Sequence, residues 1–327
     1  MRVSESGTVS VAISNGVVYF AFASHGDQSP WHGWVLGYNA TTLQQVLAYN
    51  DTPNGSFGGG GIWQAGGGLA TDTNGNIYFT TSNGDFDANT GGHDYGDSVV
   101  KLGTGGNVLD YFAPYDQAIQ SANNLDLGAG GPVLLVDQTT GPYPHLLISA
   151  GKNGTIYVIN RDSMGQFQAN SDNQIVQSVI NALPNGGAEA GNFNSPVYYN
   201  GYVYFAAVND SVRAFQLNNG LLSLTPAFVS PSIFPLRGGA MAISSNGNTN
   251  GILWVVQTNG SDPGNVNAAG TLFAYDASNL SDELYDTNES GSRDTMDRAS
   301  KFNIPLVANG KVFIASQSKL TAYGLLP

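Results

Sequence analysis

The chain has 327 residues, 43 of them glycine, and charged residues make up only 11% of it. Its net charge of −13 at pH 7 reflects a scarcity of Lys and Arg, which number 11, and it excludes nucleic acid and anionic membranes as main partners because both repel an acidic surface. The absence of cysteine excludes disulfides, thiolate metal sites and a cysteine nucleophile.

A short motif recurs along the chain: an Asn-Gly pair, one further residue, an aliphatic residue and an aromatic residue. The copies begin at Asn15, Asn74, Asn200, Asn250 and Asn309, and a degraded copy spans residues 144–148. Because Asn-Gly favours the left-handed dihedral angles of a two-residue hairpin turn, each copy predicts a tight turn into a strand. A looser motif with an Ala-aromatic or Gly-aromatic step follows most copies and predicts a third strand, as at residues 34–40, 211–215, 271–277 and 319–323.

Four antiparallel strands in each unit of about 50 to 70 residues are typical of β-propeller blades. We therefore expect an all-β propeller that occupies residues 1–327 as a single domain with six units. Their approximate boundaries are residues 8–50, 65–115, 129–181, 193–230, 237–288 and 301–327. The last unit has only three predicted strands. Either residues 1–6 supply its missing strand, or the chain is a fragment of a longer propeller.

The step at residues 274–277, Ala-Tyr-Asp-Ala, resembles the repeat of PQQ-type (quinoprotein-like) β-propellers. Further stretches resemble a group of secreted bacterial PQQ-like repeat proteins, at residues 24–27, 31–34, 60–64, 94–97 and 301–305. The resemblance covers essentially the whole chain. It implies the propeller fold, without implying a cofactor. Members of that group carry a leader and further N-terminal blades, which suggests a secreted or periplasmic protein whose leader is missing here. A cytoplasmic protein is the alternative, because residues 1–6 do not read as a signal peptide.

The longest predicted loops, including residues 24–33 and 82–97, are expected on one face of the disc, where a rigid scaffold commonly presents binding residues. This face carries three of the four histidines, together with acidic, cationic and tryptophan residues. As candidate catalytic residues we take His25, His32, His93 and Asp27. As candidate ligand-binding residues we take Trp31, Trp63, Gln64, Arg237 and Arg293. The expected ligand is a small molecule or a carbohydrate.

The loop at residues 83–97 alternates oxygen-bearing side chains in the manner of a calcium loop, because Ca²⁺ takes six to eight oxygen ligands. The candidate metal ligands are Asp85, Asp87, Asn89, Asp94 and Asp97. The loop departs from an EF-hand because its glycine comes late, at Gly91, and Gly96 stands where glutamate is expected. There are two alternatives. The loop could be rich in Asx turns and bind no metal, or it could hold a transition metal that uses His93 as a ligand.

These candidate residues are consistent with three functions. The first is a metal-assisted hydrolase of small esters, lactones or phosphoesters, with a divalent ion and His25, His32 or His93 as general base. The second is a non-catalytic propeller that binds carbohydrate or protein through Trp31 and Trp63. The third is a PQQ-dependent sugar or alcohol dehydrogenase, which would need Ca²⁺, a cationic group for the cofactor carboxylates and a histidine base.

Overall fold

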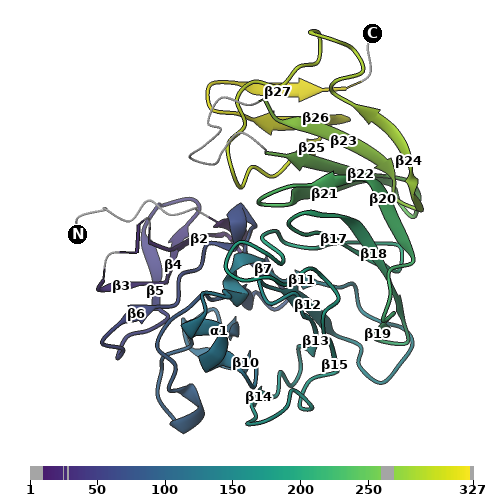
Figure 1. Ribbon diagram of the computed structural model, residues 1–327. Helices are drawn as coiled ribbons and strands as arrows, with labels where there is room; N and C mark the ends of the chain where they lie inside the picture. Colours follow the sequence, from purple (N-terminus) through teal and green to yellow (C-terminus); the bar gives the residue numbers. More distant parts are fainter. Residues whose placement is uncertain (1–9, 25, 28, 259–268, 325–327) are drawn as a thin grey trace.

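The computed structural model describes residues 10–24, 26–27, 29–258 and 269–324. Its strands form six small, mostly four-stranded antiparallel sheets that follow one another around an axis (Figure 1). The expected all-β class is therefore confirmed, as a six-bladed β-propeller. Within these ranges the only α-helix, α1, is Gln117–Ala122. None of the described helices has the length and apolar character needed to cross a bilayer.

Blades 1 to 3 are built from the first half of the chain. Blade 1 contains β1 (Ser10–Ser14), β2 (Val17–Phe22), β4 (Trp34–Asn39) and β5 (Gln45–Asn50). Blade 2 contains β7 (Ala70–Thr71), β8 (Ile77–Thr80), β9 (Val99–Leu102) and β10 (Val108–Ala113), with β14 (Gln166–Phe167) parallel to β10. Blade 3 contains β11 (Val133–Leu134), β12 (Leu146–Ala150), β13 (Ile156–Asn160) and β15 (Gln177–Val179).

Blades 4 to 6 follow. Blade 4 contains β16 (Val197–Tyr199), β17 (Tyr202–Ala206), β18 (Asp210–Asn218), β19 (Leu221–Leu222) and β20 (Phe228–Phe234). Blade 5 contains β21 (Gly239–Asn246), β22 (Thr249–Gln257), β23 (Thr271–Asp276) and β24 (Asn279–Asp286). Blade 6 contains β25 (Leu306–Ala308), β26 (Lys311–Ala315) and β27 (Leu320–Tyr323). Short elements in the connections are β3 (Trp31–His32), β6 (Gly58–Gly59) and the 3₁₀ helices η1 (Gln64–Gly66), η2 (Ala88–Thr90) and η3 (Leu127–Ala129).

Four of the five Asn-Gly pairs lie in the turn between the first two strands of a blade. Asn15 and Gly16, with φ of 48° and 74°, join β1 to β2 in this way. The pair at Asn250 differs, because it lies inside β22, and the turn before it is at residues 247–248. Asn250 keeps a positive φ of 53° there, beside the register shift between Ser244 and Asn246, so this motif marks a bulge.

The aromatic residue of the repeat packs toward the following blade. Tyr19 joins the cluster between blades 1 and 2, Tyr78 the cluster between blades 2 and 3, and Tyr204 the cluster between blades 4 and 5. Trp254 packs against the cluster between blades 5 and 6. Neighbouring residues on a strand point to opposite faces, so Ile77 and Phe79 pack back toward blade 1 while Tyr78 packs forward. Each of blades 2 to 5 is thus held by both neighbours.

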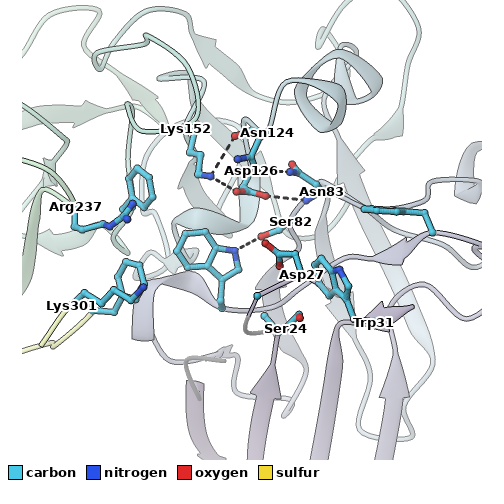
Figure 2. Close-up of a pocket in the computed structure, with 16 residues that line it drawn as sticks. Ser24, Asp27, Trp31, Ser82, Asn83, Asn124, Asp126, Lys152, Arg237 and Lys301 are labelled. Carbon is cyan, nitrogen blue, oxygen red and sulfur yellow. Dashed lines mark hydrogen bonds and ion pairs between the residues drawn. The ribbon is translucent and has the colours of Figure 1, made fainter. Parts of the chain in front are cut away.

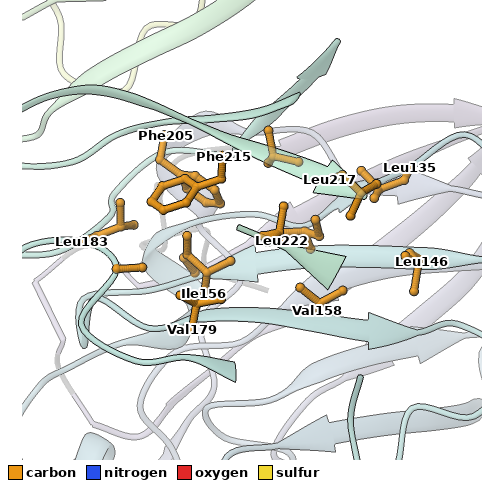
Figure 3. Close-up of a cluster of buried hydrophobic side chains, with 14 of the residues drawn as sticks. Leu135, Leu146, Ile156, Val158, Val179, Leu183, Phe205, Phe215, Leu217 and Leu222 are labelled. Atoms are coloured by element: carbon orange, nitrogen blue, oxygen red, sulfur yellow. The ribbon is translucent and has the colours of Figure 1, made fainter. Parts of the chain in front are cut away.

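The hydrophobic core is a series of clusters between consecutive blades. The cluster between blades 3 and 4 is an example (Figure 3). Blade 3 contributes Ile156 and Val158, and blade 4 contributes Phe205, Phe215 and Leu217. The rings of Phe205 and Phe215 meet edge to face, with centroids 6.0 Å apart. Burial of such side chains stabilises the fold by roughly 1.5–3 kcal/mol each, which makes these seams the main source of stability.

Blades 1 and 6 each have one face that no other described blade covers. On blade 1, the exposed fractions of Val11, Ile13 and Val46 are 48%, 69% and 55%. On blade 6, Leu306 and Leu320 are 62% and 72% exposed. No strand in the described ranges pairs blade 1 with blade 6. The expected closing strand at residues 1–6 lies outside the described residues.

Candidate functional site

The strand connections meet at the centre of the propeller and enclose a pocket of about 500 Å³, here called the axial pocket (Figure 2). Every blade contributes through a connection next to it. The loops 24–33 and 82–97 open on this same face, through Asp27, Trp31, Ser82 and Asn83. The lining residues are Ala23, Ser24, Gly26, Asp27, Trp31, Phe57, Trp63, Ser82, Asn83, Asn124, Asp126, Lys152, Phe193, Arg237, Lys301 and Phe302.

Three aromatic rings meet in the axial pocket. The Trp63 ring lies 5.9 Å from the Phe193 ring and 5.3 Å from the Phe302 ring, measured between centroids. Each of the three precedes the first strand of a blade, so alternate blades (2, 4 and 6) place an aromatic side chain near the axis. Together with Ala65, Ala129, Val208 and Leu236, the three rings form an apolar group that we call the axial hub.

Three of the chain's 11 Lys and Arg residues line this one pocket. The Lys152 Nζ lies 5.8 Å from the centroid of Trp63, the Arg237 guanidinium carbon lies 5.2 Å from that of Phe193, and the Lys301 Nζ lies 5.4 Å from that of Phe302. These distances are those of cation–π contacts, which favour a cation over the face of a ring. The pocket lining therefore holds three cations against two carboxylates, Asp27 and Asp126, in a protein that is acidic as a whole.

The three cations differ in how far their charge is compensated. Lys152 forms an ion pair with Asp126, and their side chains are only 6% and 9% exposed. Arg237 lies 2.7 Å from a carboxylate oxygen of Glu189, a residue that is 63% exposed. Lys301 has no carboxylate partner among the residues that the structure describes. Lys152 is thus neutralised within the protein, whereas Lys301 can attract a ligand anion.

Backbone and side-chain hydrogen bonds hold the ion pair and the tryptophan in place. The Asp126 Oδ1 accepts a hydrogen bond from the Asn83 N–H at 3.2 Å, and the Lys152 Nζ donates to the Asn124 carbonyl at 3.3 Å. The Trp63 indole N–H donates to the Ser82 hydroxyl at 2.5 Å (Figure 2). Two polar groups of the pocket wall therefore keep fixed positions before any ligand arrives.

Trp31 forms a second flat wall of the pocket. Its side chain is only 7% exposed, and its indole nitrogen is buried without a hydrogen-bond partner in the described part of the chain. A Cβ on Gly61 would lie 3.0 Å from this ring and 2.8 Å from the Ala23 methyl group, so only glycine fits there. Asp27, at the same edge of the pocket, is exposed.

Asp97 lies beneath the pocket wall and is fully buried. Its Oδ1 accepts a hydrogen bond from the Leu127 N–H at 3.0 Å, and its Oδ2 has no partner among the described groups. Burial raises the pKa of the Asp97 carboxyl well above its usual range, and the charge of Asp126 acts in the same direction. The Leu127 N–H and Lys152 oppose that shift without reversing it.

The candidate calcium loop does not gather its carboxylates. In the described part of the chain, no three of its acidic side chains bring ligand atoms within reach of one ion. Instead, each carboxylate accepts a backbone N–H: Asp85 from Phe57 and Gly58, Asp87 from Asp94, Asp94 from Asn54, and Asp97 from Leu127. Asn89 is exposed. These carboxylates thus hold backbone N–H groups, mostly of segments distant in sequence, and do not lie together as one ligand set; a metal bound at this loop stays a prediction.

The described histidines do not reach the axial pocket either. The His32 Nδ1 lies 3.0 Å from the Thr52 hydroxyl, where the ring packs beside Gly58. His93 is exposed and lies outside the pocket lining. His25 lies outside the described residues. His32 and His93 therefore lie outside the lining of the axial pocket, and their roles as bases stay predictions.

Two of the expected ligand-binding residues also lie elsewhere. Gln64 is fully buried, accepts the Thr80 N–H at 2.9 Å and donates to the Gly67 carbonyl at 3.2 Å, so it holds the backbone of blade 2. Arg293 is 54% exposed and pairs with Asp294 beside a different cavity, between blades 5 and 6. The other three, Trp31, Trp63 and Arg237, do line the axial pocket.

Sequence reasoning missed Lys152, Lys301, Phe193 and Phe302 as pocket residues. The sequence contains a signal for the two phenylalanines, because each stands three residues before a proline that directly precedes the first strand of a blade. Trp63 likewise precedes the first strand of blade 2, but no proline stands between them. Lys152 had no such signal, because it lies in a short connection between β12 and β13.

No protein-family model and no curated protein matches the chain. Among solved structures, it is similar to the quinohemoprotein alcohol dehydrogenase of Pseudomonas putida HK5, with 14% identity, a TM-score of 0.57, and coverage of 93% of this chain and 54% of that one. The quinohemoprotein alcohol dehydrogenase of Comamonas testosteroni has 13% identity, a TM-score of 0.57 and coverage of 95% and 56%. Sqt1 of Saccharomyces cerevisiae has 12% identity, a TM-score of 0.53 and coverage of 95% and 69%. At these identities the likeness concerns the fold, and the chain spans little more than half of each quinohemoprotein.

Proposed function

We propose that this protein binds a small carboxylated ring compound in the axial pocket. One observation supports the proposal above all: three cations, Lys152, Arg237 and Lys301, line the same pocket as the rings of Trp31 and Trp63. They do so in a chain whose net charge is −13. Ligand pockets commonly combine flat apolar walls with a few polar groups that fix orientation. Here the walls suit a ring and the cations suit carboxylates.

The charges of the pocket leave room for a ligand anion. Asp126 already compensates Lys152, so the ligand carboxylates would approach Lys301 and Arg237. Glu189 is one partner of Arg237, and its side chain is 63% exposed while that of Arg237 is only 17% exposed. A ligand carboxylate would therefore compete with Glu189 for the Arg237 guanidinium.

Pyrroloquinoline quinone is a specific candidate, because it is a planar molecule with three carboxylates. Arg237 and Lys301 would hold its carboxylates, and Trp63 would offer a ring face. When bound, such a quinone supplies two-electron oxidation of alcohols or sugars. The quinohemoprotein dehydrogenases share the fold of this chain, which supports testing this cofactor first.

A metal-assisted hydrolase has less support from the geometry. It requires a general base within hydrogen-bond reach of the reacting water. His32 contacts Thr52, His93 is exposed, and His145 pairs with Asp162, so none of the three described histidines lines the pocket. Binding of a carboxylated ring needs only groups that already line the pocket.

Calorimetric titration tests the proposal, with pyrroloquinoline quinone and galacturonate as ligands and neutral galactose as the uncharged counterpart. We expect a carboxylated ligand to bind and galactose to bind much more weakly. Lys301→Gln should weaken binding about tenfold or more, because a hydrogen bond to a charged group contributes about 1.5–3 kcal/mol. Lys319→Gln, which removes an exposed lysine outside the pocket, is the control. Equal affinities of both variants, or equal binding of galactose, would refute the proposal.

A further inference from the structure

A cavity of about 650 Å³ lies in the seam between blades 5 and 6, and it is here called the seam cavity. Blade 5 turns Ile252 and Trp254 of β22 toward it, and blade 6 turns Val312 and Tyr323, which are paired across β26 and β27. Residues two apart on a strand, and residues paired across neighbouring strands, point to the same face of a sheet. Each blade therefore presents one row of side chains to the cavity. The axial pocket shares no lining residue with it.

The seam cavity is open because blade 5 lacks two aromatic residues that fill the preceding seam. In blade 4, Tyr199 is paired with Tyr202, and both pack against the cluster between blades 4 and 5. Ile252 stands where Tyr202 stands, two residues before the aromatic residue of the repeat. Ser244, which is paired with Ile252, takes the place of Tyr199. Two rings are thus replaced by smaller side chains.

Two glycines at the same place in the motif show the difference. A Cβ on Gly251 of blade 5 would lie 2.3 Å from the Tyr199 ring, so the tyrosine of blade 4 fills its seam up to the backbone of the next blade. A Cβ on Gly310 of blade 6 would have nothing within 4 Å, and Gly310 lines the seam cavity. Space that a ring fills in one seam is therefore open in the next.

Three aromatic side chains form walls of the seam cavity, and hydrogen bonds hold them in place. The Trp254 indole N–H donates to the Ser244 hydroxyl at 2.8 Å. The Tyr285 hydroxyl donates to the Asp294 carboxylate at 2.7 Å, and the Tyr323 hydroxyl donates to the Asp294 backbone carbonyl at 3.2 Å. The polar ends of these side chains are therefore already bonded, so what they offer a ligand is flat apolar surface.

The seam cavity carries more positive than negative charge. Two cations, Arg293 and Lys311, line it together with one carboxylate, that of Asp294. Arg293 donates to Asp294 through its Nε at 2.7 Å, so these two charges compensate each other. Lys311 is exposed and forms no ion pair with any residue in the described ranges. An anionic group at the solvent edge of the cavity would therefore meet Lys311.

We propose that the seam cavity binds a small aromatic anion. Its rings would lie among Trp254, Tyr285 and Tyr323, and its carboxylate would pair with Lys311 at the edge. Ligand pockets typically enclose about 300–1,000 Å³ and combine mostly apolar walls with a few polar groups that fix orientation, and the seam cavity has both properties. A sugar suits it less well, because the hydroxyl groups of the walls are engaged within the protein.

The experiment is a calorimetric titration of the 327-residue chain with 2-naphthoate in low-salt buffer, with 2-naphthylmethanol as the uncharged counterpart. We expect the wild type to bind naphthoate at this site. Val307→Trp places an indole in the cavity and should abolish that binding. Leu306→Trp is the matched control and should retain it, because Leu306 neighbours Val307 on the opposite, 62% exposed side of the strand.

The charge of Lys311 is tested separately. Lys311→Gln should weaken naphthoate binding about two- to fivefold, the range expected for an exposed ion pair, and naphthylmethanol should bind the wild type more weakly by a similar factor. Lys319→Gln, which also removes an exposed lysine, should leave the affinity unchanged. This comparison tests the proposal even if Val307→Trp fails to fold, which circular dichroism would show.

Four outcomes would overturn the proposal. The first is no binding of naphthoate by the wild type, and the second is equal binding by Val307→Trp and Leu306→Trp, or by Lys311→Gln and Lys319→Gln. The third is loss of all naphthoate binding in Lys301→Gln, which would assign the ligand to the axial pocket. The site that Val307→Trp removes should remain in Lys301→Gln, so the two pockets are tested independently. The fourth is a dimer in light scattering that Val307→Trp dissociates, which would assign the cavity to a second copy of the chain.

Discussion

The rings of Trp63 and Phe302 meet with their centroids 5.3 Å apart and their planes inclined by 56°. Trp63 lies between blades 1 and 2, and Phe302 lies between blades 5 and 6, so the contact joins the two ends of the described arc of blades. No described strand pairing makes that connection. The axial hub therefore holds the first and last blades together at the floor of the pocket.

Phe302→Ala should lower the free energy of unfolding by about 1–3 kcal/mol, since it removes a partly buried ring and its aromatic contact. Urea denaturation measures the change. Phe57→Ala is the control, because Phe57 also lines the pocket but is 49% exposed and lies outside the hub. A loss of the same size in both variants would show that the hub contact has no special role.

Lys152→Met should destabilise the protein by about 3–5 kcal/mol, because it leaves the buried Asp126 without its counter-charge. The double variant Lys152→Met, Asp126→Asn should recover much of that loss, since the amide oxygen can still accept the Asn83 N–H. A double-mutant cycle by denaturant unfolding gives the coupling energy. Additive effects of the two substitutions would contradict the buried pair.

The stability of the protein should fall as the pH rises, partly because of Asp97. Its pKa in the folded protein is above the unfolded value of about 3.9, so folding favours the protonated form. That contribution is complete below the unfolded pKa and is lost as pH rises through the folded pKa. Asp97→Asn removes the titration, and asparagine tolerates the φ of 49° at this position.

We therefore expect Asp97→Asn to be more stable than the wild type at neutral pH, with the difference shrinking toward about pH 4. Thermal unfolding of both proteins across this range provides the comparison. Burial also raises the pKa of other carboxyls, such as Asp51. Because these groups are present in both proteins, the difference in stability between the two proteins reports on Asp97 alone. Parallel curves for the two proteins would show that Asp97 does not contribute.

Gln64→Met should lower stability by about 1–3 kcal/mol, the cost of leaving a buried group such as the Thr80 N–H without its partner. It should leave ligand affinity within about threefold of the wild type, since this side chain does not line the pocket. Urea unfolding and calorimetry measure the two quantities separately. A large loss of affinity in the folded variant would restore Gln64 as a binding residue.

His32→Gln and His93→Gln should change ligand affinity by no more than about twofold, because substitutions away from a site usually cost less than 0.5 kcal/mol. His32 contacts Thr52, and His93 is exposed. Calorimetric titration with the same carboxylated ligands is the measurement. A tenfold effect of either substitution would return that histidine to the site.

The architecture was predictable because it is repeated. One Asn-Gly pair is weak evidence, but five of them in register, each followed by an aromatic residue, specify a blade and the direction in which its aromatic side chain packs. The exception at Asn250 shows the limit of the pattern: the same dihedral angles serve a bulge as well as a turn. The sequence offers nothing local to distinguish the two.

The site was harder to predict, because its side chains come from different blades and meet only through the ring. The alternation of Asp85 and Asp87 resembles a metal loop, yet Asp85 accepts a hydrogen bond from the Phe57 N–H of another segment, and Asp87 accepts one from the Asp94 N–H of its own loop. Lys152 and Asp126 are likewise distant in sequence, and neither stands in a recognisable motif. A single sequence shows which loops share a face, but not which of their side chains meet.

The faces of blades 1 and 6 that no other described blade covers affect how the protein behaves in solution. Ile13 and Leu320 present aliphatic surface to water at the two ends of the arc, and contiguous surface of this kind promotes self-association. Mutual repulsion between molecules of charge −13 opposes that tendency at low ionic strength. Added salt screens the repulsion and leaves the apolar attraction intact. Dilute buffer, rather than physiological saline, should therefore keep the molecules apart.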